Sequence, residues 1–378
     1  MRRKVFVYGI FRHEALLGVV LGRHCAGRKA GLPHHRLSLP EGSAVPMLRP
    51  DPVETVEGQV LEDLSEAEAA RLDFCHACLG LEARSLSVTT EAGGEDVVTY
   101  VSANPPKAFE GPWSPNAWQA HFGPTMAATL ADIMALYGTK APAVVAARLG
   151  PMLVRGGSRV RAAALSPATE RQPSAPDSVV VGARHQPYAH FFAVEEYDLR
   201  FRRFDGSLSA PINRAAFVSG DAVTVLPYDP HRDRVLLVEQ FRAGPFARGD
   251  LNPWLLEAIA GRIDPGETPE DAARREAEEE AGLALGDLCE VACYYASPGA
   301  KTEYLYSYVA ITDLADGSAG VFGMADEAED IRGHLMPFDR LMALVASGEV
   351  NNAPLILTAL WLQRERPRLR GQTRGIAG

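Results

Sequence analysis

Runs of β-branched and aromatic residues alternate with helical segments through the C-terminal half of the chain. The runs predict strands, and the turn sequence at 229–233 predicts a hairpin. The strand segments are residues 179–181, 191–204, 216–218, 222–226, 234–239, 254–260, 288–296 and 302–311, and the helical segments are near 269–281, 337–347 and 353–364. This alternation predicts a mixed α/β/α sandwich. The first strands lack a self-contained hairpin pattern, which is typical of an arm exchanged between the subunits of a dimer.

A second hydrophobic pattern occupies the N-terminal part. Residues 5–8 and 56–60 predict strands, and the Ala-rich stretch at 126–149 predicts a helix. Between the two parts, residues 156–178 contain Gly, Ser, Ala and Pro with few large apolar side chains, a composition typical of a linker. We therefore expect a first domain over 1–150, a linker over 151–178 and a second domain over 179–378.

Composition agrees with two globular domains. A chain of 378 residues is too long for one ordinary core. The net charge of −10 argues against a nucleic-acid partner, so an anionic ligand would need metals or local arginines. There is no apolar run of about 18 residues, which excludes a predicted membrane-spanning helix. The odd number of cysteines, 5, suits a reducing compartment and predicts a cytoplasmic protein.

A pair of cysteines offers one alternative metal site. Cys75 and Cys78 have the two-residue spacing found in zinc sites, with His76 between them. No second clear pair accompanies them. Small buried thiols are therefore the favoured interpretation.

The most acidic stretch of the chain carries its own helix boundaries. Seven of the fourteen residues at 267–280 are acidic. Thr268 suits a helix N-cap, with an acidic residue three positions later. Pro269 suits the first helical position, and Gly282 suits a left-handed residue just beyond the end. The sequence predicts a helix over about 269–281.

Three carboxylates share one face of that helix, because Glu276, Glu279 and Glu280 are spaced i, i+3 and i+4. Like charges at this spacing repel by a few tenths of a kcal/mol per pair, and they lie at the negative end of the helix dipole. A solvated acidic face with arginine pairs is the alternative for a generic helix. A hard cation such as Mg²⁺ or Mn²⁺ explains the cluster better, because it takes carboxylate and carbonyl oxygens. Arg275 supplies a planar guanidinium that can hold one carboxylate in place.

The full spacing resembles the signature of the Nudix hydrolases. The matching positions are Gly261, Glu267, Arg275, Glu276, Ala277, Glu279, Glu280, Gly282 and Leu283. Residues from about 179 to 366 resemble bacterial ADP-ribose pyrophosphatases throughout. Pro298, fifteen residues beyond the signature, matches a proline that marks this subfamily.

The resemblance implies a metal centre and a general base. Mg²⁺ or Mn²⁺, as two or three ions, would be held by one backbone carbonyl and three carboxylates: Ala260, Glu276, Glu280 and Glu329. Glu327 matches the general base that deprotonates the attacking water. Glu279 matches a carboxylate of the metal shell whose role varies between members.

The resemblance also implies three substrate-binding residues. Arg242 matches a residue beside the diphosphate, and Glu303 matches one near the terminal ribose. Arg214 matches an arginine that reaches the nucleotide across a dimer interface. A homodimer formed through the second domain is therefore expected.

The N-terminal part resembles the γ-glutamylcyclotransferase-like (AIG2-like) fold, a mixed β-barrel with helices, over about residues 4–110. Its Tyr-Gly-x-x-Arg loop, which opens the family's substrate pocket, matches Tyr8, Gly9, Ile10, Phe11 and Arg12. Backbone N–H groups of such a turn suit an anion.

This region departs from the family at the catalytic position. The family's acid is a glutamate, whereas His76 stands there in this chain. A neutral histidine can act as a base near pH 7, but lost activity is the favoured interpretation. His76 therefore completes the predicted N-terminal pocket without a firm catalytic role.

Together these features predict a metal-dependent diphosphatase that converts ADP-ribose to AMP and ribose 5-phosphate. Another Nudix substrate, such as ADP-glucose, GDP-mannose or NADH, is one alternative. A regulatory module that binds a γ-glutamyl or amino-acid ligand through the N-terminal domain is another, and a bifunctional enzyme is a third. The two-part order also resembles bacterial proteins of the TrgB type, named for tellurite resistance. No nucleic-acid or membrane partner is expected.

Overall fold

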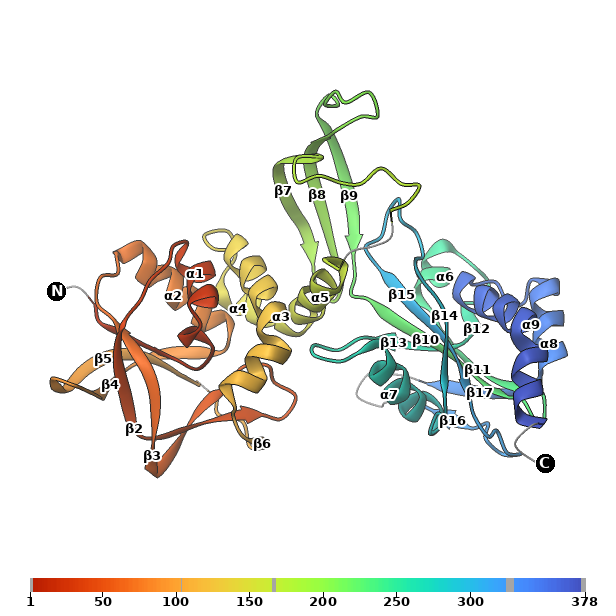
Figure 1. Cartoon of the computed structure of the whole chain (residues 1–378), viewed down its shortest axis with the longest axis horizontal. Helices are drawn as coiled ribbons and strands as arrows, with labels where there is room; N and C mark the ends of the chain where they lie inside the picture. The colour runs from red at the N-terminus through yellow and green to blue at the C-terminus, as the bar shows by residue number, and fades with distance from the viewer. Residues whose placement is uncertain (1–2, 103, 165–167, 324–329, 375–378) are drawn as a thin grey trace. The chain divides into compact units, whose positions relative to one another are not determined.

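The computed structural model divides the chain into two compact units, Met1–Pro173 and Ser174–Gly378 (Figure 1). The structure describes residues 3–102, 104–164, 168–323 and 330–374. We call the two parts the N-terminal unit and the C-terminal unit, and each is described by itself.

A closed, mixed β-barrel forms the body of the N-terminal unit. Its strands are β1 (Val5–Tyr8), β2 (Arg28–Pro40), β3 (Met47–Leu61), β4 (Leu81–Thr90), β5 (Gly93–Ser102) and β6 (Phe109–Pro112). The order is β3-β1-β5-β4-β2-β6, and β2 also pairs with β3, which closes the ring. The β1–β5 pairing is parallel, while β1–β3 and β4–β5 are antiparallel. The predicted mixed barrel with helices is confirmed.

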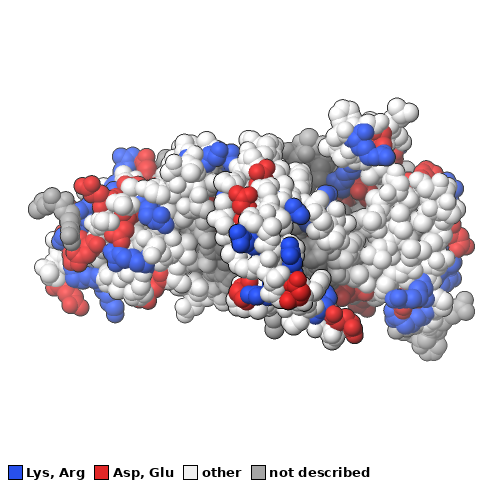
Figure 2. Space-filling model, turned by 90° about the horizontal axis from the view of Figure 1, so that it is seen from above, with Lys and Arg blue, Asp and Glu red and all other residues white. Residues whose placement is uncertain are grey.

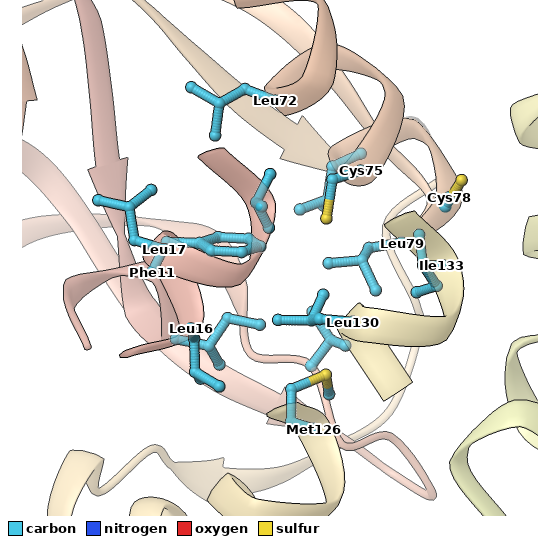
Figure 3. Close-up of a cluster of buried hydrophobic side chains, with 14 of the residues drawn as sticks. Phe11, Leu16, Leu17, Leu72, Cys75, Cys78, Leu79, Met126, Leu130 and Ile133 are labelled. Atoms are coloured by element: carbon cyan, nitrogen blue, oxygen red, sulfur yellow. The ribbon is translucent and has the colours of Figure 1, made fainter. Parts of the chain in front are cut away.

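Helices cover the barrel and complete its core. They are η1 (Gly9–Arg12), α1 (Glu14–Leu21), α2 (Glu66–Cys78), α3 (Pro115–Ala135), α4 (Pro142–Ala146) and α5 (Leu149–Ala162). Figure 3 shows apolar side chains from η1, α1, α2 and α3 meeting in one cluster, including Phe11, Leu72 and Leu130. Cys75 and Cys78 belong to this cluster, and both are free thiols. They are packing residues, as the sequence favoured.

Helix α5 corrects the first part of the predicted linker, residues 151–162. Gly156, one of the glycines that suggested a linker, has a packing role instead, because a Cβ built there would overlap Thr129 of α3. The small residue lets α5 approach α3 closely. The division between the units falls later, after Pro173.

A three-stranded antiparallel sheet, which we call the arm, opens the C-terminal unit. Its strands are β7 (Val179–Ala189), β8 (Ala193–Phe201) and β9 (Ile212–Val218), in the order β7-β8-β9. The strands pair within one chain, which corrects the predicted absence of a hairpin pattern. The register of β7 with β8 shifts between Val181 and Ala183 and between His185 and Tyr188. These shifts interrupt the alternation of side chains, so the sequence lacks the regular pattern by which a hairpin is predicted.

The second sheet, which we call the central sheet, lies between helices. Its strands are β10 (Ala222–Asp229), β11 (Arg234–Phe241), β12 (Trp254–Glu257), β13 (Ile259–Arg262), β14 (Leu288–Tyr295), β15 (Tyr304–Ile311), β16 (Val321–Phe322) and β17 (Ile331–Pro337). The order is β14-β15-β10-β11-β17-β16, with β12 on β11 and β13 on β10. The parallel β10–β15 pairing makes the sheet mixed.

Two apolar layers pack on opposite faces of the central sheet. Helix α7 (Pro269–Ala281) lies on one face, and α8 (Phe338–Ser347) and α9 (Ala353–Arg374) lie on the other, while α6 (Ala243–Arg248) follows β11 (Figure 1). Leu236 and Val238 of β11 join the α7 layer, whereas Val235 and Leu237 join the α8–α9 layer. This alternation confirms the predicted α/β/α sandwich.

Charged side chains of both signs are interspersed on the face shown in Figure 2. No helix in the described parts of the chain is long and apolar enough to cross a membrane.

Candidate active site

Helix α7 has the predicted boundaries. It spans Pro269–Ala281, and Thr268 caps it by accepting a hydrogen bond from the Asp271 backbone N–H at 3.1 Å. Gly282 ends it in the left-handed conformation, with φ of 61°. Local capping signals therefore fix where the acidic helix starts and stops.

The acidic helix packs closely on the central sheet. Four short side chains of α7 are buried against it: Ala272, Ala273, Ala277 and Ala281. The Glu276 carboxylate consequently lies against the backbone of β13, where a Cβ built at Gly261 would overlap it. Glycine at 261 is required by this close approach.

Arg275 binds three carboxylates and one carbonyl. Its Nε and one terminal nitrogen donate to Glu267 at 2.9 and 3.0 Å. The other terminal nitrogen donates to Glu276 at 2.7 Å and to Glu279 at 3.0 Å, and the Arg262 carbonyl accepts a bond of 2.9 Å. Burial disfavours the charged guanidinium, but the bonds to Glu267 and Glu276 outweigh it and raise the pKa of Arg275. A permanently charged arginine therefore orders the carboxylates.

Glu280 is the most enclosed carboxylate of this group. Its exposed fraction is 2%, and its Oε2 accepts a hydrogen bond from the backbone N–H of Ala260 at 3.2 Å. A carboxylate buried near the C-terminal end of a helix is unfavourable unless positive charge or donors face it. Glu280 therefore lies buried beside β13 with a backbone donor facing it.

The oxygen atoms gathered here suit a hard divalent cation. They come from the carboxylates of Glu276 and Glu280, which both lie beside β13 at Gly261 and Ala260. Within the described residues, no three His, Cys, Asp or Glu side chains form a group spaced to hold a metal ion. Glu276 and Glu279 are instead turned towards Arg275. Glu327 and Glu329, the other predicted members, lie outside the described residues.

Arg242 is held by a carboxylate that the sequence did not single out. Its Nε donates to Glu257 at 2.6 Å. Burial raises the pKa of Glu257, and the nearby guanidinium partly offsets the rise. In the sheet register Glu257 lies opposite Val238, whose side chain belongs to the α7 layer. The ion pair of Glu257 with Arg242 therefore lies on the same face of the sheet as the acidic helix. The available signal was a single acidic residue, Glu257, at the end of the apolar run 254–256.

The two other predicted substrate-binding residues occupy separate places. Glu303 immediately precedes β15, 4.0 Å from the Nζ of Lys301. Ala222 of β10 pairs with both β13 and β15, so Glu303 lies near the same end of the sheet as the start of the acidic signature. Arg214 is exposed on β9 of the arm, away from the central sheet's own strands.

A hollow of about 270 Å³ lies at the other face of the central sheet. It is lined by Glu239, Asn252, Trp254, Val321, Asp330 and Arg332. Glu239 is two residues from Leu237 of the α8–α9 layer and lies opposite Arg332 in the register. The side chains of Glu239 and Arg332 therefore point away from α7, to the face opposite the carboxylates on that helix.

The residues predicted to line the N-terminal pocket are packed in the structure. Tyr8, Gly9, Ile10 and Phe11 are buried, and the Tyr8 hydroxyl donates to the Tyr100 carbonyl. His76 is buried too, and its ring stacks on Tyr100 with a centroid distance of 3.6 Å.

His76 is held in a neutral form by this packing. Burial lowers its pKa to about 4, although its Nδ1 lies 2.8 Å from the Leu72 carbonyl. The Tyr100 hydroxyl donates to Asp73 at 2.8 Å, and Arg3 also binds that carboxylate. The histidine at the family's catalytic position is thus part of the core.

Family models match both units. Residues 218–358 match the NUDIX domain, and residues 5–120 match the model described as Gamma-glutamyl cyclotransferase, AIG2-like. A solved structure titled "Crystal structure of ADP compounds hydrolase" aligns with 51% of this chain and 98% of its own, at 22% identity and a TM-score of 0.40.

Curated relatives align with about half of the chain and nearly all of their own length. The ADP-ribose pyrophosphatase of Escherichia coli K12 is 39% identical over 196 residues, which cover 52% of this chain and 93% of that protein. The ADP-ribose pyrophosphatase of Haemophilus influenzae is 35% identical, covering 47% and 82%. The GDP-mannose pyrophosphatase of Klebsiella pneumoniae is 30% identical, covering 46% and 86%. With its acidic helix, its sandwich fold and these relatives, the chain belongs to the Nudix hydrolase family.

Proposed function

We propose that the C-terminal unit hydrolyses the diphosphate bond of ADP-ribose, releasing AMP and ribose 5-phosphate. The observation that carries this proposal is the set of three carboxylates bound by Arg275, one of which, Glu276, lies against Gly261 of β13. Relatives named ADP-ribose pyrophosphatase, at 39% and 35% identity, support the choice of substrate.

We propose that Ala260, through its carbonyl, and Glu276, Glu280 and Glu329, through their carboxylates, hold two or three Mg²⁺ or Mn²⁺ ions. Such ions neutralise negative charge on the phosphoryl oxygens. Glu279 shares Arg275 with Glu276 and helps to keep the carboxylates in place. Glu327 accepts the proton of the attacking water while the water oxygen bonds to phosphorus and the bridging P–O bond breaks.

The substrate-binding roles follow the positions of three polar residues. The Arg242 guanidinium, oriented by Glu257, suits the diphosphate. Glu303 accepts hydrogen bonds from the terminal ribose hydroxyls. Arg214, exposed on the arm, reaches the nucleotide of a second subunit in a homodimer.

Exposed apolar side chains on the arm support the homodimer. They include Val179, Val180, Val181, Tyr188 and Phe191, each about half exposed or more. Clusters of this kind commonly mark interfaces. We also propose a cytoplasmic location, supported by five free cysteines.

A GDP-mannose diphosphatase is the second candidate, favoured by relatives of that name at 30% and 34% identity. The two activities are separated by incubating the full-length protein with Mg²⁺ and ADP-ribose, ADP-glucose, GDP-mannose or NADH. Selective release of AMP from ADP-ribose supports the first proposal. Selective release of GMP supports the second, and no release from any compound, with Mg²⁺ or Mn²⁺, contradicts both.

We propose that the N-terminal unit does not catalyse γ-glutamyl cyclisation and instead has a regulatory or structural role. The support is the neutral, stacked His76 at the family's catalytic position. Release of 5-oxoproline from γ-glutamyl amino acids by the full-length protein would contradict this proposal. Saturable binding of those compounds without turnover would favour the regulatory role.

A further inference from the structure

The side chain of Arg262 contacts the arm. Its guanidinium carbon lies 3.6 Å from the ring centroid of Phe191 and 5.0 Å from that of Phe192. Both phenylalanines lie between β7 and β8, and we call them the aromatic turn. A guanidinium this close to aromatic faces is attracted by their π electrons. The arm is therefore joined to β13 by a specific contact.

The backbone of Arg262 belongs to the catalytic centre. It follows Gly261, on which the Glu276 carboxylate lies, and its carbonyl accepts the 2.9 Å bond from Arg275. Arg275 in turn binds Glu276 and Glu279. One residue thus connects the arm, through its side chain, to the carboxylates, through its carbonyl.

Phe217 of β9 links the aromatic turn to the segment before Glu303. Phe192 packs against Phe217 at a centroid distance of 4.7 Å. The backbone N–H of Phe217 donates to the Ala300 carbonyl at 2.7 Å, and the Thr302 N–H donates to the Phe217 carbonyl at 3.1 Å. The same turn therefore supports two edges of the proposed site.

We propose that the aromatic turn is a positioning element for diphosphate hydrolysis. It fixes Arg262, and so fixes the carbonyl that orients Arg275 and the carboxylates bound to it. Phe191 remains 60% exposed, so core packing does not account for its position, whereas its ring lies against the Arg262 guanidinium. This inference rests on the proposed diphosphatase function, and Phe191 and Phe192 act through other residues rather than on the substrate.

The test uses the full-length protein and two independent variants. Phe191→Ala/Phe192→Ala removes the rings, and Arg262→Met removes the charge while keeping the carbonyl. We expect kcat for ADP-ribose to fall about tenfold to a hundredfold in each, because small displacements of catalytic groups cost this much. KM should stay within about a factor of two, since uniform substrate binding is unchanged. The metal concentration for half-maximal activity should rise, and Phe191→Tyr/Phe192→Tyr should restore all three values.

Phe204→Ala is the matched control, because Phe204 is a 95% exposed phenylalanine of the same arm region. Mn²⁺ affinity, measured by electron paramagnetic resonance without substrate, should fall in the two positioning variants and not in the control. Wild-type kcat, metal dependence and Mn²⁺ affinity in both variants would overturn the inference, as would an equal loss in Phe204→Ala. If the double variant does not fold, Arg262→Met decides.

An inactive wild-type protein would instead contradict the proposed function. The Mn²⁺ measurements would then decide the positioning role alone. Weaker binding in the variants would support it, and equal binding would overturn it.

Discussion

The two units place ionisable side chains of a helix in opposite environments. In the C-terminal unit, two carboxylates of α7, Glu276 and Glu279, and that of Glu267 just before the helix are arranged around the charged Arg275. On α2 of the N-terminal unit, His76 is enclosed by Phe11 and Tyr100, and burial lowers its pKa to about 4. The first arrangement stabilises charge, and the second excludes it.

This contrast explains why family resemblance has different consequences in the two units. A catalytic group must be charged or exchange a proton at working pH, and its surroundings must be organised for that state. Arg275 provides such surroundings for the carboxylates. His76 instead contacts two rings and a backbone carbonyl, and the opposing charges of nearby Asp73 and Arg3 affect its pKa less than burial does. The first arrangement should be sensitive to loss of charge, and the second to gain of charge.

The largest expected effect is loss of charge at Glu280. Glu280→Gln keeps the volume of the side chain and removes its charge, so turnover of ADP-ribose should fall by at least about a hundredfold. The thermal midpoint should change little, because no core volume is lost. Steady-state kinetics with Mg²⁺ checks the result. Glu278→Gln, an exposed glutamate of the same helix, is the control and should retain wild-type turnover. Near-wild-type activity in Glu280→Gln would refute the metal assignment.

Removing the close approach of α7 should affect both stability and activity. In Gly261→Ala the new methyl group would overlap the Glu276 carboxylate. We expect a loss of about 1–3 kcal/mol in the free energy of unfolding, as for other overpacked sites. Turnover should fall about a hundredfold, because the carboxylate must move. Urea unfolding and kinetics measure the two effects.

Gly244→Ala provides the comparison for Gly261→Ala. A Cβ at Gly244 meets no atom within 4 Å, so this variant should be neutral in both assays. Equal behaviour of the two alanine variants would show that the contact between Gly261 and Glu276 is unimportant.

His76 should make the N-terminal unit sensitive to acid. Its pKa in the folded state, about 4, lies below the ordinary value of 6.5, so the unfolded chain binds more protons between these values. Stability is then complete above about pH 6.5 and falls as the pH drops towards 4, by up to about 3 kcal/mol. Hydrogen exchange of α2 amides in the full-length protein follows this loss.

His76→Phe keeps an aromatic ring and removes the titration. Stability is measured against pH for this variant and the wild type. The difference between the two profiles gives the contribution of His76 apart from that of Asp73, whose pKa is also lowered. Superimposable profiles would mean that His76 is not kept neutral by the fold.

The smallest effect is expected at another histidine of the same unit. His24 is exposed and lies 2.7 Å from Glu14. His24→Ala should change the free energy of unfolding by no more than about 0.5 kcal/mol, as for other surface sites. Thermal unfolding at pH 7 checks it. A larger loss would remove the proposed distinction between buried and exposed histidines.

Local signals in the sequence were enough to place the acidic helix. Thr268, Pro269 and Gly282 act within one helical turn of its ends, and the structure confirms all three. The carboxylates of α7 could be predicted for the same reason, since their spacing is set by the helix itself.

Contacts between distant segments were harder to predict. The bond between Arg242 and Glu257 depends on the register of β11 with β12, and the contact of Arg262 with the aromatic turn depends on where the arm folds back. Gly156 was misleading for a related reason. In the sequence, glycine indicates a flexible backbone. Only the packing of α5 on α3 shows that Gly156 is needed because a larger side chain would overlap Thr129.

The parallel pairing of β10 with β15 has a consequence for folding. It joins segments far apart in the chain, since Thr224 and Ser307, which share a hydrogen bond across the two strands, are 83 residues apart. The whole signature from Gly261 to Leu283 lies inside the loop that this pairing closes. Closing such a loop costs entropy before any contact compensates it, which slows folding. Tyr308 and Ala310 of β15 belong to the apolar layer beneath α7, so during synthesis this layer is complete only after β15 has emerged and paired.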